Sequence, residues 1–350
     1  MTLSNEDTQK TLARLREFPL FSSVKEDDWE VLSQSMTREQ YKRDVRVISA
    51  GENASDLFWI EEGEVSVFRD TPFGPQPIAD LPTQSLFGEL SLIDGRGRST
   101  DVQTKTGAVI WRIDGAQLGQ LFEERPPLAC LFYRYFWASL AQKINLANNQ
   151  IQKFFGGKEP TKQEKQHSRP AWFAPPKGIQ VDSSSSIPAA MPGNVKLTDA
   201  QKRRVLEDAG LAPPEIELLF KLGEEMVISE DEAVFHEGDF GDTLYFIVHG
   251  QVRISKKIEG IGEEALAILE RGQFFGEMAL VSENAVRSAD CYAHEGDVLM
   301  LAFRLHMLNT LEGDAEHDYP FLSALCKMMT HRLREINEKL FSWKMMTGGF

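Results

Sequence analysis

Two short stretches of the sequence carry residue types that suit the capture of a small phosphate attached to a sugar. The glycine in each lets backbone approach a ligand closely, because it has no Cβ. The arginine can clamp phosphate oxygens with two parallel charge-assisted bonds. The acid would repel a phosphate, so a sugar hydroxyl is its natural partner. The residues are Phe87, Gly88, Glu89, Leu90, Arg98 and Ser99, and then Phe275, Gly276, Glu277, Met278, Arg287 and Ser288.

The order and spacing of these residues are nearly the same in both stretches. Glu89 precedes Arg98 by nine residues, and Glu277 precedes Arg287 by ten. The apolar run after each acid can open a short helix, whose first N–H groups would point at an anion. An ordinary tight turn with a surface arginine is the alternative interpretation. The repetition favours a binding site, since one copy alone is a weak motif.

The second half of the chain repeats the first at an offset of 187 residues. Gly51 and Gly63 match Gly238 and Gly250 at this offset. The run Leu57-Phe58-Trp59-Ile60 matches Leu244-Tyr245-Phe246-Ile247. The offset at the two acids is 188, which indicates one inserted residue. We therefore expect two copies of one domain.

Within each copy, short alternating runs with glycines between them predict antiparallel strands closed into a small roll or barrel. The first copy places Val65, Val67 and Trp111 in such runs, from Tyr41 onward. The second copy does so from Val227 to Val234 and again at Leu244 and Phe246. The predicted fold class is α+β, with two antiparallel β-rolls of the jelly-roll type, each flanked by helices and followed by a long helix.

The predicted flanking helices begin before the first strands. Pro19 should break a first helix that carries Leu12 and Leu15. The sequence Ser23-Val24-Lys25-Glu26 is a capping box for a second helix that runs through Met36.

Each roll is followed by a helix with one continuous apolar stripe, after Pro126-Pro127 and after Pro320. The stripe must be buried on the roll, on the other copy or on a second chain, so a homo-oligomer through the long helices is open. Aromatic residues of the first helix either cap a purine or pack in the core. They are Phe132, Tyr133, Tyr135, Phe136 and Trp137. On the second helix, Arg332 and Arg334 either approach a pocket or stay solvated.

Residues 156–193 have the composition of a linker, with six prolines and a serine run. We therefore expect domain A at 1–155, a Pro/Ser-rich linker at 156–194 and domain B at 195–350. Trp172 and Phe173 stand among prolines and resemble a docking peptide, which would pack on one of the two domains or bind a partner. The alternative is that these two aromatic residues have no particular role.

The net charge of −15 argues against nucleic acid or an anionic membrane as a partner. No run of about eighteen apolar residues occurs, so no membrane insertion is expected. The first residues are polar and acidic and do not resemble a secretion signal. Cys130, Cys291 and Cys326 lack disulfide or metal-ligand spacing. We expect a cytoplasmic protein with reduced cysteines.

Both stretches resemble the phosphate-binding cassette of the cyclic-nucleotide-binding domain, the sensor domain of the catabolite activator protein and of cAMP-dependent kinase regulatory subunits. The resemblance covers about residues 10–155 and 200–345. It implies that Glu89 and Glu277 bind the ribose 2′-OH, and that Arg98 and Arg287 bind the cyclic phosphate with help from Ser99 and Ser288.

The sequence departs from the family pattern at two places in each copy. Gly97 and Val286 stand where a proline often precedes the arginine. Asp101 and Asp290 stand three residues after the arginines, where the family more often has an uncharged residue. We expect these aspartates to face solvent, because charges are seldom buried unpaired.

The resemblance implies a non-enzymatic sensor that transmits ligand binding to an unknown protein partner. No cofactor is expected. The ligand would be cAMP rather than cGMP, since serine follows both arginines; another cyclic nucleotide remains open. The alternative is an interaction or scaffold protein on the same fold that no longer binds nucleotide, against which the intact Glu and Arg pairs argue.

Two further classes of function fit less well. A metal enzyme on a related barrel needs clustered histidines, and only His236 and His249 precede the motif in the second roll. A transcription factor needs a recognition helix and a basic face, which the sequence lacks.

Overall fold

The computed structural model describes residues 15–16, 18–71, 74–154, 196–258, 262–277, 286–304 and 315–346. The chain splits into two compact units, with main bodies at Met1–Phe136 and Pro175–Leu340. Leu12, Trp172, Phe173, Met278 and the linker predicted at 156–194 lie outside the described residues. The domain boundaries at 155 and 195 also lie outside them and stay predictions.

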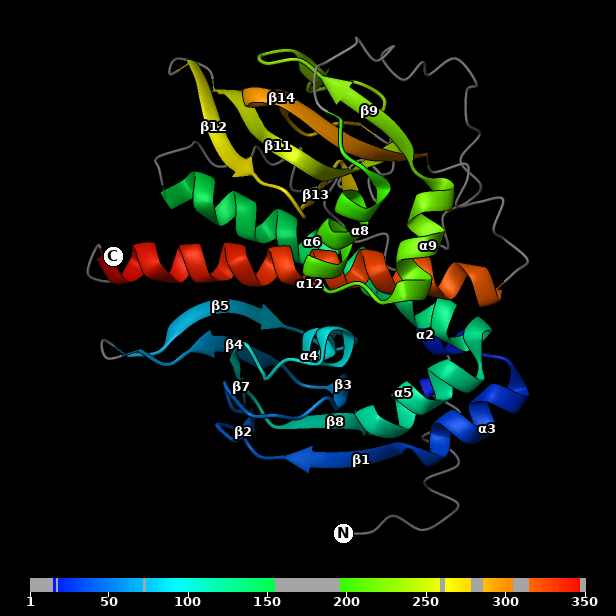
Figure 1. The fold of residues 1–350 in the computed structure, drawn as a ribbon. Coiled ribbons are helices and arrows are strands. Elements are labelled where there is room, and N and C mark those ends of the chain that lie inside the picture. Colours follow the sequence, from blue (N-terminus) through cyan, green and yellow to red (C-terminus); the bar gives the residue numbers. More distant parts are fainter. Residues whose placement is uncertain are drawn as a thin grey trace. The chain divides into compact units, whose positions relative to one another are not determined.

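The first unit combines two four-stranded antiparallel sheets with helices (Figure 1), in the orders β1-β8-β3-β6 and β2-β7-β4-β5. Its elements are α2 (Pro19–Ser22), α3 (Glu26–Gln34), β1 (Met36–Tyr41), β2 (Arg46–Ile48), β3 (Leu57–Glu62), β4 (Val65–Arg69), β5 (Gln76–Leu81), β6 (Leu86–Phe87), α4 (Glu89–Asp94), β7 (Asp101–Thr104), β8 (Ala108–Ile113) and α5 (Gly115–Glu124), with α6 (Pro126–Phe154) beginning in this unit.

Alternation along β3 shows why this unit has both a sheet core and a helix-covered face. Successive side chains of a strand point to opposite faces of its sheet. Phe58 belongs to a core cluster that draws on both sheets and includes Ile110. Its neighbour Trp59 instead contacts Phe21, with ring centroids 5.4 Å apart. Phe21 in turn lies 6.4 Å from Phe132 of α6. The apolar stripe of α6 therefore begins on the back of the β3 sheet.

The second unit is built on one six-stranded antiparallel sheet, in which β10-β14-β11-β12 is extended by β13 on β11 and β9 on β14. Its elements are α8 (Asp199–Asp208), α9 (Pro213–Leu222), β9 (Glu224–Ile228), β10 (Ala233–Phe235), β11 (Thr243–Ile258), β12 (Gly262–Leu269), β13 (Phe274–Phe275), β14 (Asp290–Arg304) and α12 (Ala315–Met346). The mixed helix and strand content with antiparallel pairing confirms the predicted α+β class.

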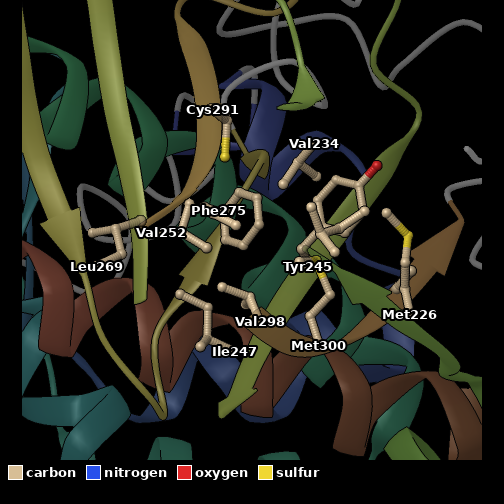
Figure 2. Close-up of a cluster of buried hydrophobic side chains, with 13 residues drawn as sticks. Met226, Val234, Tyr245, Ile247, Val252, Leu269, Phe275, Cys291, Val298 and Met300 are labelled. Atoms are coloured by element: carbon tan, nitrogen blue, oxygen red, sulfur yellow. The ribbon is translucent and has the colours of Figure 1, made fainter. Parts of the chain in front are cut away.

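The core of the second unit is a cluster of buried side chains from its strands (Figure 2). Tyr245 and Phe275 stack with ring centroids 5.0 Å apart. The matching pair in the first unit, Phe58 and Phe87, stacks at the same distance. The predicted repeat is thus present in the cores as well as in the sequence.

The predictions for three element boundaries were wrong. The capping box at Ser23 is not formed, because α3 begins after Lys25 and its first turn holds three acids near the positive helix end. Met36 starts β1 instead of ending that helix. The last helix begins at Ala315, so Pro320 lies inside it. Pro320 is the sixth residue of this 32-residue helix, where a proline removes one hydrogen bond and crowds the carbonyl of residue i−4. The rest of the helix must therefore offset a cost of about 3 kcal/mol.

A left-handed glycine ends the short strand before each predicted acid. Gly88 has φ +87° and Gly276 has φ +88°. A Cβ on Gly88 would lie 2.8 Å from the Asp56 carbonyl oxygen, and one on Gly276 would lie 2.7 Å from Arg287 Nη1. Both the backbone conformation and the close approach therefore require glycine.

None of the helices in the described part of the chain is long and apolar enough to cross a membrane.

We expect Phe132→Ala to lower the free energy of unfolding by about 3–5 kcal/mol, because it removes a fully buried ring and leaves a cavity. Urea-induced unfolding of the full chain measures this change. Val45→Ala, at a residue that is 37% exposed, is the control and should change stability by less than about 0.5 kcal/mol. A Phe132→Ala effect as small as that of the control would contradict the core position of Phe132.

Gly88→Ala and Gly51→Ala form a second matched pair. Both residues have positive φ, at +87° and +82°, so each alanine costs about 1–2 kcal/mol in the backbone. Only the Cβ at position 88 meets other atoms; none lies within 4 Å at position 51. Gly88→Ala should therefore be the more destabilising by about 1–3 kcal/mol. Equal unfolding free energies for the two variants would show that the turn is not tightly packed.

Candidate ligand-binding sites

The structure places the predicted residues of the first copy around one turn. Phe87 ends β6, Gly88 precedes α4, and Glu89 is the first residue of that helix. Glu89 is fully buried, and Arg98 is 5% exposed. Leu90 and Ser99 are half-buried.

Arg98 is held by main-chain carbonyl groups from two other segments. Its Nη1 donates to the Gly88 oxygen at 2.8 Å, and its Nη2 donates to the Asp56 oxygen at 2.7 Å. The guanidinium also lies over the ring of Phe58, 5.6 Å from the ring centroid. The cation thus joins the turn before α4 to the start of β3.

Arg287 repeats this arrangement in the second copy. Its Nη1 donates to the Gly276 oxygen at 3.0 Å, and its Nη2 donates to the Thr243 oxygen at 2.8 Å. Its guanidinium lies 4.2 Å from the ring centroid of Phe235 and 5.5 Å from that of Tyr245. Phe275 and Gly276 lie at this turn as predicted; Ser288 is exposed, and Met278 is outside the described residues.

The electrostatic state of Arg287 suits an anion. Burial lowers the pKa of its guanidinium, against nearby groups, Tyr245 first, that raise it. Its Nε is buried without a hydrogen-bond partner among the described residues. A desolvated cation whose partners are neutral carbonyls gains strongly from a phosphate within reach.

Glu277 is held by the last helix. Arg332 of α12 donates from Nη1 to Glu277 Oε1 at 2.9 Å and to the Phe274 oxygen at 3.0 Å. Glu277 is 2% exposed. Its second oxygen, Oε2, has no hydrogen-bond partner in the part of the chain that the structure describes. Of the two alternatives left open for Arg332, the structure therefore shows approach to the site.

The helix after the first roll brings a different residue near Glu89. Burial first, and then the negative charge of Glu89, raise the pKa of the Tyr135 phenol. The neighbouring Phe132, Tyr133 and Phe136 are buried and contact one another or Phe122. These three residues follow the core-packing alternative.

The expectation that Asp101 and Asp290 face solvent was wrong. They are 3% and 4% exposed. Each accepts a backbone N–H bond, from Ala50 at 3.0 Å and from Glu237 at 2.9 Å, and each contacts a basic side chain. A buried charge is tolerated when it is paired in this way.

Sequence reasoning missed the acceptors of both arginines, which are the carbonyl groups of Gly88, Asp56, Gly276 and Thr243. A main-chain acceptor has no residue-type signature. The repeat was the one available signal, since Asp56 and Thr243 match at the offset of 187.

Comparisons with known proteins identify the family of this chain. The sequence model of the family described as "Cyclic nucleotide-binding domain" matches residues 38–125 and 225–311. The Cyclic AMP receptor protein of Thermus thermophilus is 33% identical over 134 residues, which are 37% of this chain and 58% of that protein. cGMP-dependent protein kinase 2 of Homo sapiens is 20% identical over 315 residues, which are 89% of this chain and 32% of the kinase.

The cAMP-dependent protein kinase regulatory subunit of Mucor circinelloides f. lusitanicus is 22% identical over 275 residues, which are 79% of this chain and 48% of the subunit. The chain thus spans between 32% and 58% of the length of these three relatives. The two segments that the family model matches make up half of the 350 residues. The chain belongs to the cyclic nucleotide-binding domain family and holds two copies of the domain.

Proposed function

We propose that this protein is a non-enzymatic sensor that binds a cyclic nucleotide at two sites and passes ligand occupancy to a protein partner. The observation that carries the proposal is the buried pair in each copy, Glu89 with Arg98 and Glu277 with Arg287. Family membership supports the ligand class. The relatives named above include proteins named for cAMP and for cGMP, so their names do not choose the base.

In this proposal the cyclic phosphate lies at Arg98 and at Arg287, with Ser99 and Ser288 adding hydroxyl bonds. The arginine cations are already desolvated and oriented, so little is lost in ordering them when the ligand arrives. Serine after each arginine favours cAMP over cGMP. The proposed sites also include Phe87, Leu90, Phe275 and Met278, as the sequence pattern predicts.

The ribose 2′-OH is proposed to donate to Glu89 and Glu277. In the second copy the uncommitted Oε2 of Glu277 is the acceptor, while Oε1 stays with Arg332. The same carboxylate thus touches both the ligand and α12, which makes α12 the element that carries the signal. We also propose that the two domains are bounded at residues 155 and 195, and that the protein is cytoplasmic.

An interaction module that binds no nucleotide is the second candidate. This candidate does not explain why both copies contain a buried arginine, bound to carbonyl groups, together with a buried glutamate. Titration calorimetry with cAMP, cGMP and cyclic dinucleotides separates the two candidates directly. Binding of none of them at millimolar concentration would leave only the interaction module.

Replacing both arginines, in Arg98→Ala with Arg287→Ala, should weaken binding of the cyclic nucleotide by about 30- to 4,000-fold. The physical reason is loss of the desolvated partner of the phosphate, about 2–5 kcal/mol per site. Calorimetric titration measures the change. Arg96→Ala is the control, since Arg96 is exposed in the loop just before Arg98 and should leave affinity unchanged. Parent-like affinity in the double variant would refute the phosphate assignment.

A ligand that lacks the ribose 2′-OH should bind more weakly by about 1.5–3 kcal/mol, the value of a hydrogen bond to a charged group. The comparison is between cAMP and 2′-deoxy-cAMP on the parent chain. In a Glu89→Ala, Glu277→Ala variant the two ligands should bind equally, because the acceptor is gone. A preference for cAMP that survives this substitution would assign the hydroxyl to another residue.

A further inference from the structure

A buried aspartate follows each of the two arginines by three residues. We propose that Asp101 and Asp290 are positioning residues that fix the main chain of Arg98 and Arg287 through one neighbouring loop, and so set the affinity of each site. This inference rests on the proposed function, because the affinity in question is that for a cyclic nucleotide. The aspartates themselves touch no ligand in this proposal.

In the first copy the aspartate holds the loop just before β3. Asp101 Oδ1 accepts from the Ala50 N–H at 3.0 Å and from Arg46 Nη1 at 3.1 Å. Its Oδ2 accepts from the Asp70 N–H at 3.4 Å. The two residues after Ala50 then bond to the main chain of Arg98. The Gly51 N–H donates to the Arg98 oxygen at 2.8 Å, and the Arg98 N–H donates to the Glu52 oxygen at 2.9 Å.

In the second copy a loop of different sequence does the same. Asp290 Oδ1 accepts from the Glu237 N–H at 2.9 Å and lies 3.2 Å from His236 Nδ1. Gly238 N–H donates to the Arg287 oxygen at 3.0 Å, and Arg287 N–H donates to the Asp239 oxygen at 2.8 Å. In each copy the loop is thus hydrogen-bonded both to the aspartate and to the arginine, and the three-residue segment of chain between these two closes the ring.

The residues common to the two loops show which features this hydrogen-bonded arrangement requires. The loops read Ala50-Gly51-Glu52 and Glu237-Gly238-Asp239, so glycine and a following acid are common to both. Both glycines have positive φ, +82° and +91°, which turns their N–H groups toward the arginine. The acid inside each turn bonds to an N–H at its start, Glu52 to Ser49 at 3.5 Å and Asp239 to His236 at 2.8 Å. Asp101 and Asp290 add the bond that ties the start of the turn to the segment that follows the arginine.

A carboxylate suits this position because it is the strongest acceptor for a backbone N–H. In the first copy its buried charge is balanced by Arg46, and in the second its Oδ1 lies 3.2 Å from the imidazole Nδ1 of His236. An arginine whose N–H and C=O are both fixed presents its guanidinium in one place. Fixing the cation before the ligand arrives reduces the entropy lost on binding.

A general structural role for the aspartates makes a different prediction from a positioning role. A residue that acts only through Arg287 loses its effect on ligand affinity when the guanidinium is replaced, so the two substitutions are not additive. A residue that merely stabilises the roll weakens binding by the same factor in either background.

The test measures cAMP affinity of the full chain by calorimetry, with the first site removed by Arg98→Ala so that the second is read alone. Asp290→Ala should weaken binding by about tenfold or more, as expected for a lost bond to a charged acceptor. In an Arg287→Lys background the same substitution should change affinity by less than about twofold. An equal factor in both backgrounds, or no loss with Asp290→Ala, would overturn the proposal.

Asp290→Asn covers the case in which Asp290→Ala does not fold. Asparagine keeps an acceptor for the Glu237 N–H and removes the charge, so it should weaken cAMP binding by about two- to fivefold, again only when Arg287 is present. Parent-like affinity in Asp290→Asn, with Asp290→Ala unfolded, would refute the positioning role of the charge.

Amide hydrogen exchange in the ligand-free chain provides a readout that needs no nucleotide. The Gly238 and Arg287 amides should exchange at least about tenfold faster in the variant that weakens binding, while the Ile268 amide in β12 should not change. If the parent chain binds no cyclic nucleotide, both the proposed function and this inference are refuted. If the parent chain binds cAMP and the Asp290 variants bind it with the same affinity, only this inference is refuted.

Discussion

Each roll is organised around a buried guanidinium that is bonded to main-chain carbonyl groups. Arg98 joins Gly88 to Asp56, and Arg287 joins Gly276 to Thr243. These bonds fix the turn in which the glutamate lies, so the positions of acid and base are set together. In the second copy these acceptors of Arg287 are neutral carbonyls, which do not cancel its charge, so this cation can also attract an anion.

The use of main-chain acceptors explains why the two copies keep the site while their sequences differ. Asp56 and Thr243 share no side-chain chemistry, yet each supplies the same carbonyl group. The loops at Gly51 and Gly238 differ at most neighbouring positions and still carry the same pair of bonds to the arginine. What cannot vary is the glycine at 88 and 276, where a Cβ would meet the arginine or its acceptor.

Local patterns in the sequence therefore predicted the strands, the repeat and the two Glu and Arg pairs, since each depends on spacing along the chain. Features that depend on distance in space were missed. The burial of Asp101 and Asp290 depends on amide groups about fifty residues away, at Ala50 and Glu237. The pairing of Arg332 with Glu277 depends on where α12 lies against β13, which no local pattern encodes.

The pairing of Arg332 with Glu277 also determines how a signal would leave the second site. The ion pair uses Oε1 and leaves Oε2 for a sugar hydroxyl, so ligand binding would not have to displace α12. A hydroxyl at Oε2 would hold the carboxylate in place, and would thereby favour the docked helix. Coupling between sites is reciprocal, so a partner that draws α12 away must weaken ligand binding by the same factor. In the first copy the phenol of Tyr135, on α6, lies near enough to Glu89 for the charge of that acid to raise the pKa of the phenol. In the second copy an ion pair thus links the buried glutamate directly to a helix, and in the first copy α6 brings a phenol toward the corresponding glutamate.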